Sequence, residues 1–92
     1  QDNTMQKLIN RKGADIYVDL REVKAIQDVS FFQVQPHPQP KKLIHQALID
    51  MGSESNYYVK LDPPGSGGIG FAEGGKTGTY CELLKLIENA KA

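Results

Sequence analysis

The chain has 92 residues, of which 39% are hydrophobic, and eleven Lys and Arg residues balance eleven Asp and Glu residues. This length allows one modest core, and the zero net charge makes nucleic acid an unlikely partner, because nucleic-acid binders usually carry a basic excess. No apolar run reaches the roughly 18–20 residues of a membrane span, and a single cysteine excludes an internal disulfide, which suits a reducing, cytoplasmic setting. We therefore expect one soluble domain over residues 5–92, after a tail at residues 1–4 that is disordered or an expression-vector remnant.

A β-hairpin is predicted at the start of the domain. Residues 5–10 alternate between polar and apolar side chains, and residues 15–20 alternate again. Gly13 lies between the two segments and can adopt the positive φ that a tight turn requires. The pattern indicates two antiparallel strands joined by this turn.

The next stretch, residues 20–28, fits either a helix or a strand. Residues 19–22 (Asp-Leu-Arg-Glu) have the spacing of a capping box, which favours the start of a helix. The β-branched and aromatic side chains that follow favour a strand. We predict one helical turn and then a strand over about residues 24–34.

A helix is predicted after the proline-rich connector at residues 35–40, which is expected to be extended. Residues 41–51 form this predicted helix, and Gly52 is a natural stop. The apolar residues that follow the i, i+3, i+4, i+7 rule are Ile44, Ala47, Leu48 and Met51.

The second half of the chain predicts two strands and a final helix. Residues 56–62 alternate well, and residues 69–73 predict a shorter strand after a loop rich in Gly and Pro. Thr79 and Glu82 have capping-box spacing and open a helix over residues 79–90. Its apolar stripe consists of Tyr80, Leu83, Leu84 and Ile87.

These elements predict a small α+β domain in the order β-β-β-α-β-β-α. Short connections favour a mainly antiparallel sheet of four to five strands with two helices on one face. The opposite face of such a sheet is exposed unless a partner covers it.

Residues 70–77 (Gly-Phe-Ala-Glu-Gly-Gly-Lys-Thr) match the phosphate-loop pattern of nucleotide-binding proteins. Three features argue against an NTPase: the helix cap falls at Thr79, residues 69–73 predict a strand where the motif needs a loop, and no later strand supplies a magnesium-binding aspartate. A weaker interpretation is an anion or phosphate site at the start of the last helix. Its residues would be Gly74, Gly75, Lys76, Thr77, Gly78 and Thr79.

No catalytic constellation, cofactor site or metal site is predicted. Cys81 could pair with His45 or His37 as a nucleophile, but a partly buried structural cysteine is the simpler interpretation. The carboxylates are scattered, and two histidines with one cysteine do not make a metal site.

The preferred functional hypothesis is a domain that is not an enzyme and binds a protein or a ligand. Without net charge the chain has little electrostatic protection against self-association, so a homo-oligomer is expected. Leu43 and Ile49 widen the apolar surface of the predicted helix over residues 41–51, and tyrosines could lie on the open sheet face. The predicted interface residues are Leu43, Ile49, Tyr17 and Tyr58. The two alternatives are the anion site at residues 74–79 and weak single-stranded nucleic-acid binding on the tyrosine-bearing face.

Overall fold

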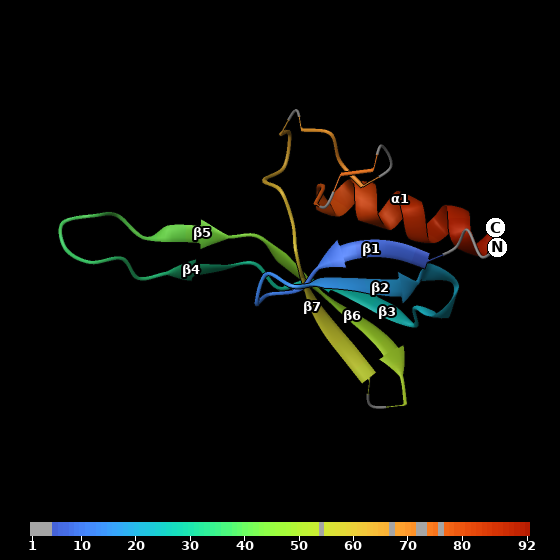
Figure 1. Cartoon of the computed structure of the whole chain (residues 1–92). Coiled ribbons are helices and arrows are strands. Elements are labelled where there is room, and N and C mark those ends of the chain that lie inside the picture. The colour runs from blue at the N-terminus through green and yellow to red at the C-terminus, as the bar shows by residue number, and fades with distance from the viewer. Residues whose placement is uncertain (1–4, 54, 67, 72–73, 76) are drawn as a thin grey trace.

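The computed structural model describes residues 5–53, 55–66, 68–71, 74–75 and 77–92. These residues form a small α+β domain with a long protruding hairpin (Figure 1). Its elements are β1 (Met5–Ile9), β2 (Asp15–Asp19), the 3-10 turn η1 (Leu20–Glu22), β3 (Ala25–Asp28), β4 (Phe31–Gln33), β5 (Lys42–Ile44), β6 (Gln46–Gly52), β7 (Ser55–Lys60) and α1 (Tyr80–Lys91).

The α+β class holds, but the predicted order and number of elements are wrong. Within the described residues, seven strands in three small antiparallel sheets and one α-helix replace four to five strands and two helices. The main error concerns residues 41–51, which form β5 and most of β6 and are not helical. Strand β6 is the centre of the sheet β3-β6-β7, and Leu48 and Ile49 lie on its two opposite faces. Apolar side chains on both faces of a central strand imitate helical spacing.

The N-terminal hairpin is confirmed. Strands β1 and β2 pair with Leu8 opposite Ile16. In the turn between them, the Asn10 side-chain oxygen accepts hydrogen bonds from the amides of Lys12 (2.9 Å) and Ala14 (3.0 Å). Gly13 has a φ of 89°, the left-handed conformation that glycine adopts most easily. The side chain of Asn10 and the freedom of Gly13 therefore fix the hairpin register.

The ambiguous segment after this hairpin contains both predicted structures in succession. The Asp19 side chain accepts a hydrogen bond from the amide of Arg21 and caps η1, and β3 begins three residues after η1 ends. The strand expected over residues 24–34 is interrupted after Asp28 and resumes as β4.

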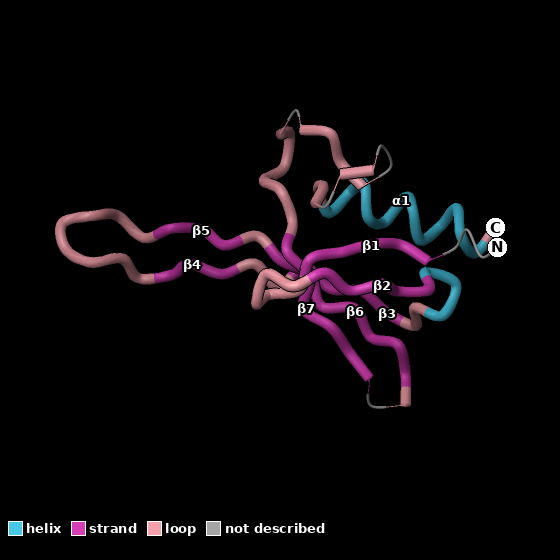
Figure 2. Tube along the Cα trace, viewed as in Figure 1, coloured by secondary structure: helices cyan, strands magenta, loops and turns pink. Residues whose placement is uncertain are grey.

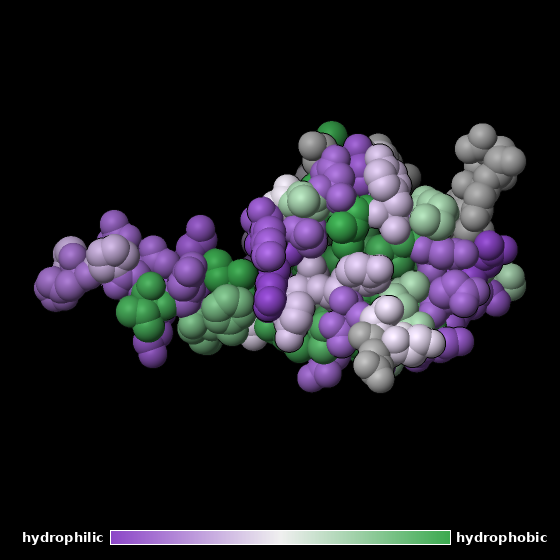
Figure 3. Space-filling model, turned by 60° about the horizontal axis from the view of Figure 1, so that its bottom comes forward, coloured by the Kyte–Doolittle hydropathy of each residue, from purple (hydrophilic) through white to green (hydrophobic). Residues whose placement is uncertain are grey.

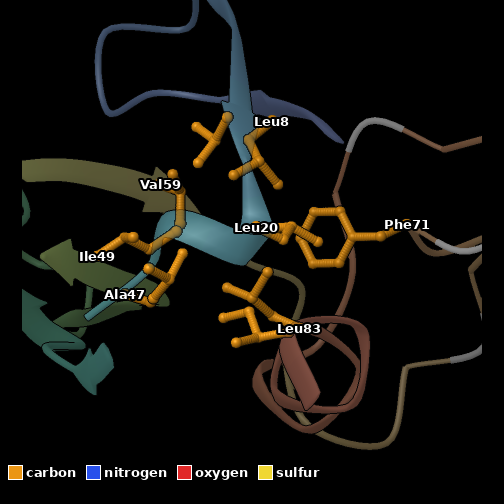
Figure 4. Close-up of a cluster of buried hydrophobic side chains, with 10 residues drawn as sticks. Leu8, Leu20, Ala47, Ile49, Val59, Phe71 and Leu83 are labelled. Atoms are coloured by element: carbon orange, nitrogen blue, oxygen red, sulfur yellow. The ribbon is translucent and has the colours of Figure 1, made fainter. Parts of the chain in front are cut away.

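The hydrophobic core lies between the strands and α1. Strand β1 approaches β7 through a bridge between Asn10 and Val59, which places the N-terminal hairpin beside the β3-β6-β7 sheet. Figure 4 shows side chains from both sheets and from η1 pointing toward Phe71 of the long loop and Leu83 of the helix. The buried hydrophobic cluster contains Leu8, Val18, Leu20, Val23, Ala47, Ile49, Val59, Phe71, Leu83 and Ile87.

The C-terminal helix is confirmed almost to the residue. The Thr79 side chain accepts a hydrogen bond from the amide of Glu82 and acts as the N-cap of α1. Leu83 and Ile87 are buried one turn apart, as the predicted stripe requires. The helix therefore closes one side of the core.

The strand predicted at residues 69–73 is not present in the part of this segment that the structure describes. Ile69 is 66% exposed and Gly70 turns the chain with a φ of 81°, so that Phe71 enters the core, where it is only 2% exposed. Ala72 and Glu73 lie outside the described residues. A left-handed glycine before a buried aromatic residue makes this segment a core-filling loop.

Strands β4 and β5 form a two-stranded ribbon, hereafter the arm, which extends the β3–β6 pair away from the body of the domain (Figure 2). Its tip, residues 34–41, contains the proline-rich segment. The molecule measures 50 × 32 × 20 Å with a radius of gyration of 13.9 Å, whereas a compact chain of this length is expected near 12 Å. The arm makes the molecule elongated.

Candidate binding surface

The arm exposes large hydrophobic side chains at a distance from the core. Phe31 is 45% exposed, Phe32 65%, Val34 78% and Leu43 40%. Figure 3 shows hydrophobic residues on the arm between hydrophilic ones. An isolated two-stranded hairpin is marginally stable in water, and both edges of such a ribbon have unpaired backbone groups. The arm therefore leaves apolar side chains and backbone edges uncovered in the described structure.

The two faces of the arm differ in chemistry. Phe32 pairs with Leu43, and continuing the alternation one residue beyond each strand places Val34 and Lys41 on the same face. Its apolar residues, Phe32, Val34 and Leu43, are called the apolar face. The opposite face combines Phe31 and its partner Ile44 with Gln33 and its partner Lys42. One ribbon therefore presents an apolar surface on one side and a mixed aromatic and basic surface on the other.

A hydrogen-bonded joint connects the arm to the body. The Ser30 hydroxyl donates to the Asp28 carboxylate (2.7 Å) and accepts from the amide of Gln46 (3.2 Å), while the amide of Ser30 also donates to Asp28 (3.0 Å). The amide of Val29 donates to the carbonyl of Gln46 (3.1 Å). These bonds span the point where β3 gives way to β4 and β5 to β6, and they fix the arm to the sheet.

The joint also sets the charge state of Asp28. The hydrogen bonds from the Ser30 hydroxyl and amide hold the pKa of this carboxyl below its usual value of 3.8. Both donors stabilise the ionised form, and this effect outweighs the small desolvation of a mostly exposed group.

A groove of about 600 Å³ lies at the base of the arm. Its apolar lining consists of Phe31, Leu43, Ile44, Leu61 and Pro63, so Leu43 borders both this groove and the apolar face. Its cationic side chains are Arg11, Lys42 and Lys60. A second hollow of about 280 Å³ lies beside it and is lined by Asn10, Arg11, Lys12, Asn56, Tyr57 and Tyr58. Arg11 belongs to both linings, and its guanidinium carbon lies 4.5 Å from the centre of the Tyr58 ring. The two hollows together are called the basic groove.

The predicted interface residues occupy different environments. Leu43 is on the arm and Tyr17 is 63% exposed on β2, whereas Tyr58 is half-buried beneath Arg11. Ile49 is fully buried in the core, with Ile26 and Tyr57 as its cross-strand neighbours. These four residues do not form one surface, and Ile49 has no exposed area to offer a partner.

The predicted anion site lies in a loop that folds against α1. Thr77 donates a hydrogen bond to the Asp62 carboxylate (2.7 Å), and the amide of Asp62 donates to the carbonyl of Gly78 (2.7 Å). Thr79 caps the helix, and Lys76 lies outside the described residues. The hydroxyl that a phosphate loop would direct to magnesium is thus bonded to Asp62.

The carboxylate of Glu82 lies inside this loop. Atoms built in place of a side chain on Gly70 or Gly78 would collide with it, and at Gly78 such an atom would also lie 2.7 Å from Cδ2 of Phe71. Gly75 approaches the backbone of Gly70 and donates its amide to the Gly70 carbonyl at 2.8 Å. Close packing around a protein carboxylate accounts for glycine at Gly70 and Gly78, and the close approach of two backbone segments accounts for it at Gly75.

The candidate nucleophile and histidines are placed apart. Cys81 is exposed in the first turn of α1, contrary to the expectation of a partly buried residue. His45 lines the basic groove, and His37 lies in the tip of the arm. Among the described residues, no three His, Cys, Asp or Glu side chains are grouped in a way that could hold a metal ion.

Sequence reasoning missed the arm and the basic groove. Two signals were available: strand-forming residues lie on both sides of the prolines, and no Asp or Glu occurs between Val29 and Ile49. The contributions of Arg11 and Lys60 could not be found this way, because only the fold brings the first hairpin and β7 to the base of the arm.

Comparison with known proteins finds no matching family model, no significantly similar curated protein and no significantly similar solved structure. In the described part of the chain, no helix has both the length and the apolar character needed to cross a bilayer.

Proposed function

We propose that this protein acts by binding other macromolecules and that it associates with a second copy of itself through the apolar face of the arm. The observation that carries the proposal is the exposure of Phe32, Val34 and Leu43 on a ribbon that projects from the core. Burying such a face removes apolar surface from water at about 25 cal/mol per Å².

A second copy is the partner that this surface fits best. A two-fold axis brings the same patch of both chains together, so an apolar face needs no complementary charge pattern on its partner. Pairing would also cover the exposed faces of two ribbons that are marginally stable alone. The zero net charge of the chain means that long-range repulsion opposes such pairing only weakly.

Light scattering after size exclusion tests this proposal between about 5 and about 200 µM, since association depends on protomer concentration. We expect a dimer for the natural sequence and a monomer for the double variant Phe32→Thr, Val34→Thr. Threonine keeps the strand propensity of the arm and removes most of its apolar surface.

Tyr17→Thr is the matched control, because it removes an equally exposed side chain from a strand outside the arm. We expect this variant to remain a dimer. A natural sequence that is monomeric over the whole range would refute self-association, and dissociation by Tyr17→Thr alone would place the interface on the N-terminal hairpin.

A further inference from the structure

We propose that the basic groove binds single-stranded nucleic acid. The groove consists of two hollows that share Arg11, one at the base of the arm and the other beside the turn of the N-terminal hairpin and β7. It lies within one chain, and the proposal therefore does not rest on self-association.

The charge of the groove differs from that of the chain. Four of the eleven Lys and Arg residues line it, and no Asp or Glu is among its described lining residues. These cations are Arg11, Lys12, Lys42 and Lys60. Contacts between such cationic side chains and phosphate groups supply most of the non-specific affinity of proteins for nucleic acid. The chain as a whole has zero net charge, but the surface of this groove is locally basic. The absence of a net basic charge therefore does not argue against nucleic-acid binding at this groove.

Aromatic side chains lie between these cations. Phe31 is 45% exposed at the base of the arm, and Arg11 lies over the ring of Tyr58. Aromatic rings and a flat guanidinium provide surfaces on which bases stack, and each stacked base contributes about 1–3 kcal/mol in single-strand binders. Asn56 and Gln33 add amide groups that can bond to base edges.

The combination of cationic and aromatic side chains in the groove favours a single strand over a duplex or an acidic peptide. The bases of a duplex are already stacked on one another, so aromatic side chains gain little from it, whereas unpaired bases are free to stack on protein rings. An acidic peptide would use the cations and would leave the aromatic rings without a matching group. RNA and single-stranded DNA share the chemistry required here.

Fluorescence anisotropy with labelled oligo-dT and oligo-U of about 15 nucleotides tests the proposal. At about 50 mM salt we expect binding in the micromolar range, weakening steeply toward about 200 mM. In the double variant Arg11→Ala, Lys60→Ala, the affinity for the oligonucleotide should fall about tenfold or more. The slope of log K against log salt should decrease in magnitude by about 1.4, because each lost contact with a single-strand phosphate contributes about 0.7. The relative affinity for the two oligomers distinguishes DNA from RNA.

The charge control is Lys85→Ala, Lys91→Ala, which removes two exposed cations from α1 and leaves the groove intact. We expect both the affinity and the salt slope to stay within about twofold of the natural values. An equal loss in this control would show that only general charge matters and would overturn the proposal.

The stacking test compares Phe31→Leu with Phe32→Leu, neighbours on opposite faces of the arm. Both substitutions replace an aromatic ring with an apolar side chain. The two variants differ because only Phe31→Leu removes a ring that lines the groove. Phe31→Leu should lower the affinity about fivefold or more with an unchanged salt slope, and Phe32→Leu should have no effect.

Three results would refute the proposal. The first is no anisotropy change at about 100 µM protein and low salt. The second is equal binding by Phe31→Leu and the natural sequence. The third is displacement of the oligonucleotide by polyglutamate at matched charge, which would identify the groove as a site for acidic peptides.

Discussion

The loop before α1 shows how a single residue type is set by packing. Glycine at Gly70, Gly75 and Gly78 leaves room for the Glu82 carboxylate and for the close approach of two backbone segments. The resemblance of this loop to a phosphate-binding motif follows from the same need for small residues beside a helix N-terminus. In this protein the Glu82 side chain of α1 lies against Gly70 and Gly78, at the two ends of this loop.

This packing predicts the effect of adding one methyl group. Gly78→Ala should lower the free energy of unfolding by about 1–3 kcal/mol, because the new Cβ would meet both Glu82 and the ring of Phe71. Gly68→Ala is the control, since its Cβ would make only an ordinary contact, 3.5 Å from an Asp62 side-chain oxygen. Urea denaturation of both variants measures the difference, and equal stability would contradict this account of the loop.

At the scale of elements, the joint between the arm and the sheet decides how the arm is presented. Gln46 is 8% exposed, the only polar residue in the described part of the chain that is buried, and its backbone groups bond to Val29 and Ser30. Buried polar groups are nearly always hydrogen-bonded, so this arrangement restricts the ways in which the arm can leave the body. The two faces of the arm thereby keep fixed directions relative to the basic groove.

The joint makes a prediction about pH. In Ser30→Ala the pKa of Asp28 should rise toward its usual value, because the hydroxyl is the main group that lowers it. In the natural sequence, the folded-state pKa lies below the unfolded value of about 3.8, so the contribution of Asp28 to stability is complete above that pH and disappears as the pH falls through the folded value.

An NMR titration of the Asp28 carboxyl measures this shift directly. In Ser30→Ala, the amides of β4 and β5 should also exchange their hydrogens faster than in the natural sequence, whereas the exchange rates of the α1 amides should not change. An unaltered Asp28 pKa in Ser30→Ala would mean that the joint does not hold this carboxylate in solution.

For the whole molecule, one small core supports an elongated shape. Strands from both sheets, η1, the loop at Phe71 and α1 all contribute to a single buried cluster, while the arm lies outside it. The arm therefore contributes little to global stability. Local opening of the arm and unfolding of the core are expected to be separate events.

The dependence on one core is testable at Leu83, which is fully buried. Leu83→Ala should cost about 2–5 kcal/mol of unfolding free energy, a large share of the stability of a domain of this size. The adjacent Leu84→Ala serves as control, because Leu84 is only half-buried and should cost clearly less. Thermal or urea unfolding monitored by circular dichroism compares the two, and equal losses would contradict the assignment of Leu83 to the centre of the core.

The sequence by itself determined the elements whose signals are local. The N-terminal hairpin followed from alternation and Gly13, η1 from the cap at Asp19, and α1 from Thr79 and its apolar stripe. Each depends on residues close together in the chain, so no distant partner was needed to recognise it. The same reasoning predicted a binding role, which stays a prediction, and exposed tyrosines, of which Tyr17 is exposed and Tyr58 is half-buried.

Only the tertiary structure decided the conformation of residues 41–51 and the position of the basic groove. These residues could be a helix by spacing, and they became strands because β3 and β7 supply hydrogen-bonding partners on both sides of β6. The groove brings together Arg11, Lys42 and Lys60 from three separate strands and turns. Pairing between distant strands carries no local sequence signal, and for that reason the central sheet and the assembled groove were visible only in the folded chain.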